Sequence, residues 1–491
     1  MMKHALLTCL AAVVAVTAFA QREVPADSVI VTKHETTIKG QHISYTAYKG
    51  TQPVWNGDDK VIATVDYTYY ERDGISDRDS RPLVISFNGG PGSASVWMQI
   101  AYTGPALLNI DDEGYPVQPY GVKKNPYSIL DVADIVFVNP VNTGYSRILD
   151  KEADRSTFFG TNADIKYLAE WINTFVTRQN RWNSPKYLIG ESYGTTRVSG
   201  LALELQSNQW MYLNGVILVS PTDLGIERGG PMEVALRLPY FAATAWFHKM
   251  LPADLQQKDL TEVLPEVEQY TINEFLPAVA KGGMLSTAEK AAVAKQVARY
   301  SGLDEEVILQ NNLDVSTQLY WKELLRDSGY TVGRLDSRYR GIDRRNAGER
   351  PDYNAELTSW LHSFTPAIND YMRNELNFKT DAKYYMFGPV HPWNRSNDRT
   401  GENLRAAMAQ NPYLHLMVQS GYYDGACDYF NAKYSMWQMD PSGRLQDRMS
   451  FKGYRSGHMM YLRKEDLQKG NEDIREFIKA SLPGEGVPAK F

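Results

Sequence analysis

The serine in the segment Gly190-Glu191-Ser192-Tyr193-Gly194 has a glycine two residues before it and another two residues after it. This spacing matches the pattern GxSxG, in which a strand turns sharply into a helix around a nucleophilic serine. A serine hydroxyl is a poor nucleophile unless a base takes its proton and a third group orients that base. If Ser192 attacks a carbonyl carbon, the sequence must therefore also supply a histidine and an acid.

In α/β sheets that carry this pattern, the partners follow the serine in the order acid, then histidine. Asp424 is the candidate acid because it follows the apolar stretch LHLMV, residues 414–418, on an expected loop after a late strand. Asp428 is a second possible acid, although it fits the start of the next helix better. His458 is the only histidine after Asp424 and is the candidate base.

A tetrahedral intermediate also needs hydrogen-bond donors for its oxyanion, usually the amide after the nucleophile and an amide from an early glycine-rich loop. Tyr193 supplies the first of these amides. The segment FNGGPGS, residues 87–93, ends an early apolar strand and offers Gly90 or its neighbour Gly89 for the second. Taken alone, this segment is typical of an ordinary turn, since Gly-Pro-Gly is common in turns.

The elements that must position these residues alternate between strands and helices. Continuous apolar runs indicate buried strands, and apolar residues at helical spacing indicate a helix over 162–182. The expected buried strands lie at 81–92, 131–140, 186–190, 214–220 and 413–424. This alternation predicts an α/β fold with a mostly parallel sheet and helices on both faces. Residues 32–72 alternate apolar and polar side chains and predict an antiparallel edge.

Composition divides the rest of the chain into three parts. Residues 21–220 form the first part of the predicted core and residues 384–491 the second part. Between them, residues 221–383 lose the alternation and predict a helical cap insertion. Within that insertion, the mixed-charge loop 337–352 is interpreted as solvated surface.

Residues 1–20 predict a cleaved secretory signal peptide, because Lys3 precedes an apolar run that ends in the small-residue pattern Ala18-Phe19-Ala20. We therefore expect the mature protein to be periplasmic or extracellular. Cys9 lies in this segment, so Cys427 is expected to be the only cysteine of the mature chain. An intramolecular disulfide is then impossible.

The formal net charge of −6 gives no basic signature of a nucleic-acid-binding protein. The remaining histidines lack metal-ligand spacing, and neither a phosphate-binding glycine loop nor a dinucleotide fingerprint is present. We expect no cofactor and no metal, and a small-molecule or peptide partner.

Four segments together resemble the signature segments of the serine carboxypeptidases, and they occur in the same order. They are FNGGPGSAS (87–95), GESYG (190–194), GYYDGACD (421–428) and SGHMM (456–460). The resemblance implies an α/β-hydrolase fold with a helical cap. It also implies a catalytic triad of Ser192, Asp424 and His458, an oxyanion hole from the amides of Gly90 and Tyr193, and a site for the substrate's free C-terminal carboxylate at Asn88 and Glu191. A protonated Glu191 could donate to that carboxylate, whereas a charged one would repel it.

Two positions depart from the family's pattern. Tyr102 stands where the family usually has a second glutamate paired with Glu191, and a Tyr102–Glu191 hydrogen bond would not share a proton as two carboxyls do. The histidine loop reads His458-Met459-Met460-Tyr461 rather than His-Met-Val-Pro. We expect this second change to alter the loop more than the chemistry.

The predicted reaction is the release of the C-terminal residue from peptides with a free C-terminus. An exported serine esterase or acyltransferase with the same triad is the alternative, because the second glutamate is missing. A peptide- or glycan-binding protein on an inactive hydrolase scaffold is a third interpretation. The intact set of serine, acid, histidine and oxyanion donors disfavours it.

Overall fold

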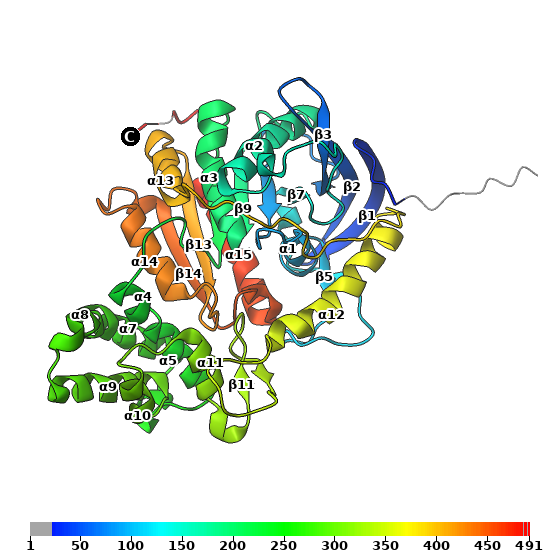
Figure 1. The fold of residues 1–491 in the computed structure, drawn as a ribbon. Coiled ribbons are helices and arrows are strands. Elements are labelled where there is room, and N and C mark those ends of the chain that lie inside the picture. Colours follow the sequence, from blue (N-terminus) through cyan, green and yellow to red (C-terminus); the bar gives the residue numbers. More distant parts are fainter. Residues whose placement is uncertain (1–21, 485, 489) are drawn as a thin grey trace, which may run out of the picture.

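The protein is described by a computed structural model that covers residues 22–484, 486–488 and 490–491. Its centre is a ten-stranded sheet in the order β1-β2-β3-β7-β4-β9-β10-β13-β14, in which the short strand β8 (Arg147–Ile148) also pairs with β3 (Figure 1). The predicted signal peptide, residues 1–20, lies outside the described residues.

Antiparallel strands form one edge of this sheet. They are β1 (Ser28–Ile38), β2 (Gln41–Trp55) and β3 (Val61–Arg72). Strand β1 alternates half-buried and exposed residues along most of its length, which is the pattern of a strand with one solvated face. The antiparallel edge predicted for residues 32–72 is confirmed.

Parallel strands make up the remainder of the sheet. In spatial order they are β7 (Asp134–Asn139), β4 (Leu83–Phe87), β9 (Lys186–Glu191), β10 (Gly215–Val219), β13 (His415–Gly421) and β14 (Met449–Tyr454). Alternate residues of β10 enter two different hydrophobic clusters, with Val216 and Leu218 in one and Ile217 and Val219 in the other. A strand that is apolar on both faces must be covered on both faces.

Helices cover each face of the sheet. On one face lie α2 (Thr161–Arg178), α3 (Tyr193–Asn208), α13 (Thr400–Gln410) and α14 (Tyr429–Met439). On the other lie α1 (Val96–Ala101), α12 (Ala355–Asp370) and α15 (Lys464–Ser481). The predicted α/β plan, a mostly parallel sheet with helices on both faces, is confirmed.

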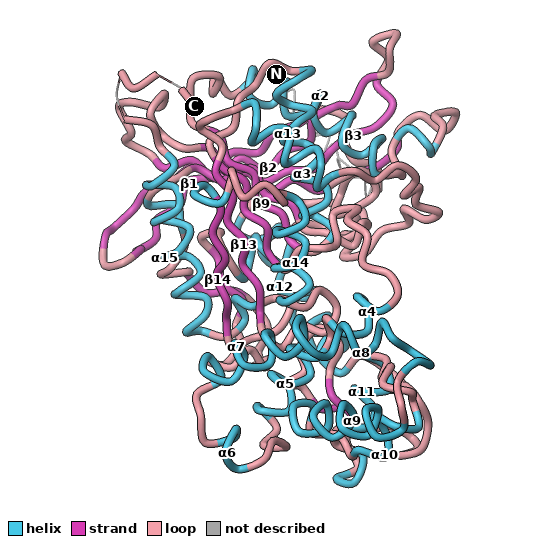
Figure 2. Tube along the Cα trace, turned by 90° about the vertical axis from the view of Figure 1, so that its left-hand side faces the viewer, coloured by secondary structure: helices cyan, strands magenta, loops and turns pink. Residues whose placement is uncertain are grey.

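The chain between β10 and β13 contains a helical layer with its own hydrophobic cluster. In two perpendicular views this layer lies beyond one end of the sheet (Figure 1, Figure 2). Its helices are α4 (Pro231–Ala235), α5 (Leu238–Phe247), α6 (Ala253–Gln256), α7 (Leu260–Tyr270), α8 (Leu276–Lys281), α9 (Thr287–Ser301), α10 (Glu305–Gln310) and α11 (Thr317–Glu323). The limits 221 and 383 of the insertion stay a prediction.

Two small hairpins lie outside the main sheet. Strands β5 (Ala106–Leu108) and β6 (Val122–Lys124) form one, and β11 (Thr331–Val332) and β12 (Arg340–Gly341) form the other. Among the described helices, none combines the length and the apolar composition needed to cross a bilayer.

A buried arginine of helix α3, Arg197, binds both an acid of α2 and the loop after β4. Arg197 Nε donates to Asp164 Oδ2 at 2.6 Å, and both side chains are almost completely excluded from solvent. The same guanidinium donates to the carbonyl oxygens of Asn88 at 2.8 Å and of Pro91 at 3.3 Å. Because these carbonyls belong to the glycine-rich segment 87–93, Arg197 holds that loop against α3.

We expect Asp164→Ala to lower the free energy of unfolding by about 3–5 kcal/mol, because it leaves the Arg197 guanidinium buried without its counter-ion. Urea denaturation followed by circular dichroism measures this loss. Asp27→Ala is the matched control, since it breaks an ion pair with Arg178 that is exposed on both sides. Its cost should stay below about 1 kcal/mol, and equal losses in the two variants would contradict the role given to the buried pair.

Candidate functional site

Ser192 lies at the turn between strand β9 and helix α3, as the GxSxG spacing predicts. Its backbone has φ 57° and ψ −127°, a region that residues other than glycine rarely adopt. Its N–H donates to the Val219 carbonyl oxygen of β10 at 3.0 Å. A β-carbon at Gly190 would lie only 2.2 Å from the Gly194 carbonyl oxygen, so the turn requires glycine at that position.

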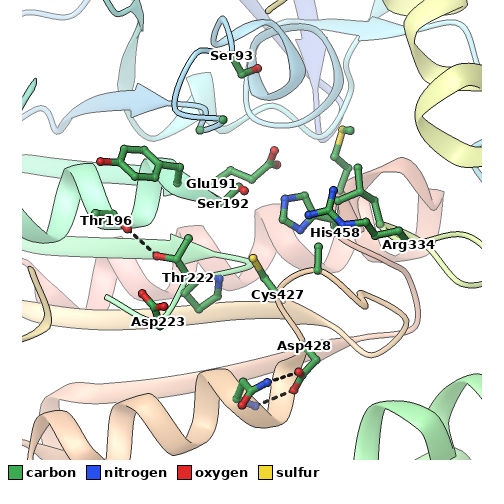
Figure 3. A pocket seen from close by; sticks show the side chains of 18 of the residues that line it. Ser93, Glu191, Ser192, Thr196, Thr222, Asp223, Arg334, Cys427, Asp428 and His458 are labelled. Carbon is green, nitrogen blue, oxygen red and sulfur yellow. Dashed lines mark hydrogen bonds between the residues drawn. The ribbon is translucent and has the colours of Figure 1, made fainter. Parts of the chain in front are cut away.

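Ser192 lines one pocket together with His458 (Figure 3). Gly90, Glu191 and Tyr193 line the same pocket. Within the described part of the chain, no hydrogen bond joins Ser192 to His458. The fold thus brings the candidate nucleophile and the candidate base to one cavity from two different loops.

Asp424 lies directly behind His458. The Nδ1 nitrogen of His458 lies 2.6 Å from Asp424 Oδ2, and both side chains are buried. The other carboxylate oxygen, Oδ1, accepts from the N–H groups of Ala426 at 2.8 Å and Cys427 at 3.0 Å. This arrangement keeps the proton on Nδ1 and leaves Nε2 free to accept a proton from a nucleophile.

The charge of Asp424 sets the basicity of His458. Burial alone would lower the pKa of His458, but the negative charge and the hydrogen bond of Asp424 outweigh it and raise the pKa above 6.5.

The second possible acid, Asp428, makes no hydrogen bond with His458 among the described residues. It instead caps helix α14 by accepting from the Asn431 N–H at 2.8 Å.

The two candidate oxyanion donors belong to loops in direct backbone contact. Tyr193 is the first residue of α3, where the N–H has no acceptor within the helix. A β-carbon at Gly89 would lie 2.4 Å from the Tyr193 nitrogen, so the glycine-rich loop packs against the turn with no room for a side chain. Gly90 follows with a φ of 105°, and both Gly90 and Tyr193 border the pocket.

Asn88 and Glu191 form a buried pair beside Ser192. Asn88 Nδ2 donates to Glu191 Oε1 at 2.9 Å, and Tyr461 donates its hydroxyl proton to Glu191 Oε2. Burial raises the pKa of Glu191 to about 7, although the positive charge on His458 and the two hydrogen bonds oppose the rise. Glu191 can therefore be protonated near neutral pH.

Tyr102 makes no hydrogen bond with Glu191 in the described structure. The Tyr102 hydroxyl donates to Gln419 Oε1 at 2.7 Å, and its ring stacks on Tyr461 with centroids 4.6 Å apart. Tyr461, the last residue of the unusual histidine loop, is the residue that reaches Glu191. The change from His-Met-Val-Pro thus affects the chemistry of the site, contrary to our expectation from sequence.

A segment of the insertion, residues 334–337, lies between the loops of the candidate acid and base, and we call it the bridge segment. The Leu335 carbonyl accepts from the N–H of His458 at 2.7 Å, and the Arg334 carbonyl accepts from the N–H of Gly425 at 2.9 Å. The insertion therefore fixes both loops through backbone hydrogen bonds. The sequence pattern of the insertion did not indicate this role.

Glu356 supports the bridge segment from helix α12. Its Oε1 accepts from the Leu335 N–H at 2.8 Å, and its side chain is completely buried. The residues after the bridge are also covered: Arg338 pairs with Asp336 at 2.7 Å, and Tyr339 is buried. The interpretation of 337–352 as solvated surface is therefore wrong for its first residues.

The fold is that of the α/β-hydrolases. A solved structure with the same architecture is that of Kex1(Δ)p, a prohormone-processing carboxypeptidase from Saccharomyces cerevisiae, with a TM-score of 0.52 and 13% identity over 89% of this chain and 91% of that one. At this level of identity the likeness concerns the fold alone.

Sequence comparison identifies the family within that fold. The family model for serine carboxypeptidases matches residues 60–460, so the chain belongs to the serine carboxypeptidase family. Curated relatives include serine carboxypeptidase-like 36 of Arabidopsis thaliana, 29% identical over 31% of each chain. Another is serine carboxypeptidase S10 family member 1 of Dictyostelium discoideum, 25% identical over 45% of this chain and 48% of that protein. The matched region spans about a third to a half of these relatives' lengths.

We expect Tyr461→Phe to raise the pKa of Glu191 by about one to two pH units, since a hydrogen bond to a charged group contributes roughly 1.5–3 kcal/mol and one unit corresponds to about 1.4 kcal/mol. Infrared titration of the protonated carboxyl band measures this pKa, with Glu191→Gln identifying the band. Tyr102→Phe is the matched control because it removes a neighbouring hydroxyl that bonds Gln419 instead. Identical titrations in the two variants would refute the assignment of Tyr461.

Proposed function

We propose that this protein is an exported serine carboxypeptidase that releases the C-terminal residue of peptides. The observation that carries the proposal is the bonded pair of Asn88 and Glu191. Glu191 immediately precedes the candidate nucleophile, and a protonated carboxyl beside an amide presents donors to a free carboxylate.

The proposed reaction begins when Ser192 Oγ attacks the carbonyl carbon of the last peptide bond and His458 Nε2 takes its proton. The oxyanion that forms accepts hydrogen bonds from the Gly90 and Tyr193 amides. Asp424 holds the imidazolium in place through Nδ1. His458 then gives the proton to the nitrogen of the leaving residue, the C–N bond breaks, and the peptide remains as an ester on Ser192.

Water completes the cycle. His458 takes a proton from a water molecule, which attacks the ester carbonyl, and the same two amides donate hydrogen bonds to the second oxyanion. Collapse of this intermediate breaks the bond to Ser192 Oγ, which recovers its proton from His458. The shortened peptide leaves with a new C-terminal carboxylate.

Export rests on the sequence of residues 1–20, with its charged start, its apolar run and its small-residue end. The described chain has one free cysteine, Cys427, and no disulfide. We place the mature protein in a periplasm or outside the cell, where it would act on peptides with a free C-terminus.

A serine esterase or acyltransferase is the second candidate. The observation that favours it is the replacement of a second glutamate by Tyr102, whose hydroxyl is engaged by Gln419 and gives nothing to the substrate carboxylate. With one carboxyl instead of two, the demand for a free C-terminus would be weaker.

Three substrates separate the two candidates: an N-blocked dipeptide, its C-terminal amide and a simple acyl ester. We expect the free-acid dipeptide to be cleaved at least about tenfold faster than the amide, because only its carboxylate meets Asn88 and Glu191. Ser192→Ala should lose at least about a thousandfold in kcat for each substrate cleaved. Serine-dependent cleavage of the ester alone would contradict the carboxypeptidase proposal and favour the esterase.

The pH dependence should differ between the free-acid peptide and the ester. Glu191 must be protonated to donate, so kcat/KM for the peptide should fall as the pH rises through about 7, the pKa of Glu191. His458 must be neutral to act as a base, so both substrates should lose activity toward acid pH. The ester, which needs no carboxylate donor, should keep its rate on the alkaline side. Parallel profiles for the two substrates would contradict the role of Glu191.

A further inference from the structure

The bridge segment places an arginine in the candidate substrate pocket. Arg334 lines the pocket together with Ser192 and His458, and its side chain is exposed to the cavity (Figure 3). Its backbone is immobilised, because its carbonyl accepts from Gly425 and the following residue bonds to His458. The backbone from which the guanidinium extends is therefore fixed to the loops of the candidate acid and base.

The guanidinium of Arg334 has no partner of its own. Across the described residues, its side chain makes no ion pair and no hydrogen bond. In contrast, Arg338, four residues later, is buried and paired with Asp336. An arginine held at the edge of an active site with all of its donors free is suited to bind a carboxylate, often through two parallel hydrogen bonds.

None of the acids that line the same pocket forms an ion pair with Arg334 among the described residues. Asp428 is bonded to Asn431, Asp398 accepts from the backbone and hydroxyl of Thr400, and Asp223 accepts from the Gly225 N–H. In Figure 3, Asp223 lies on the side of Cys427 away from Arg334. The charge of Arg334 acts on His458, on Cys427 and on the buried carboxyl group of Glu356, with which it makes no hydrogen bond.

A second arginine of this cavity also lacks a bonded partner. Arg228 also lines the pocket, is half-buried, and likewise has no ion pair or hydrogen bond among the described residues. Its charge acts on Cys427 and on Asp428. Two unpaired guanidinium groups therefore flank the cavity beside the candidate catalytic acid and base.

The C-terminal carboxylate of a substrate already has its donors at Asn88 and Glu191. We propose that Arg334 binds a second carboxylate, the side chain of an aspartate or glutamate next to the scissile bond, and that this enzyme prefers acidic peptides. This inference rests on the proposed carboxypeptidase activity and names its substrate class.

The test uses N-acetylated dipeptides with leucine in one position and glutamate, glutamine or lysine in the other, in both orders. We expect the wild type to prefer glutamate over glutamine about tenfold in kcat/KM in one of the two positions, and this preference should shrink at high ionic strength. In Arg334→Gln the glutamate-to-glutamine ratio should fall to about one, and in Arg334→Glu lysine should become the preferred residue.

Arg340→Gln is the matched control. Arg340 lies in the same hairpin, is exposed, and packs over the ring of Tyr330 at 5.6 Å outside the pocket lining. It should keep the wild-type ratio, and thermal unfolding of all variants verifies that they are folded.

Three results would overturn the inference. The first is a wild-type glutamate-to-glutamine ratio in kcat/KM near one, and the second is a wild-type ratio that is unchanged in Arg334→Gln. The third is an equal loss of kcat/KM for every free-acid substrate in Arg334→Gln, which would assign Arg334 to the C-terminal carboxylate. In each case, serine-dependent cleavage of the neutral peptides would leave the proposed activity standing. Absence of any serine-dependent peptide cleavage would overturn both proposals.

Discussion

Backbone contact without intervening side chains is the constraint on which the whole site depends. At the carboxyl end of β9, the left-handed turn at Ser192 packs directly against the loop that follows β4. A β-carbon at Gly194 would lie 2.7 Å from the Phe87 carbonyl oxygen, and one at Gly89 would lie 2.4 Å from the Tyr193 nitrogen. This contact brings a nucleophile and two amide groups together before any catalytic side chain is placed. The strained conformation of Ser192 persists because the sheet on either side fixes it.

The second organising feature is a carboxyl group kept out of water. Burying Glu191 favours its neutral form, whereas the donors Asn88 and Tyr461 favour its charged form. The balance leaves its pKa about 7, where a small change in surroundings converts a donor into a repelling charge. Members of the family with two carboxyls can share a proton between them. Here the hydroxyl of Tyr461 supplies the neighbouring proton, so the two arrangements differ in chemistry.

Sequence patterns predicted the parts of this structure that local physics determines. Buried parallel strands, the GxSxG turn and the pairing of His458 with Asp424 rather than Asp428 follow from apolar runs, glycine positions and chain order. Strand β14 escaped prediction because its residues are mostly half-buried and lack a continuous apolar run. The contact of Tyr461 with Glu191 and the bridge segment also escaped, since each depends on loops that are far apart in the chain and meet only after folding.

The bridge segment has a consequence for how such enzymes can diversify. A β-carbon at Gly457 would lie 2.4 Å from the Leu335 carbonyl oxygen, so the histidine loop and the insertion fit together at the level of the main chain. Because main-chain atoms of both parts make this fit, replacing the insertion alone would disturb the position of His458. The residues of the bridge segment that hold the histidine loop must therefore change together with the core. Selection for a new substrate therefore has to act on a stretch of chain that also maintains the catalytic machinery.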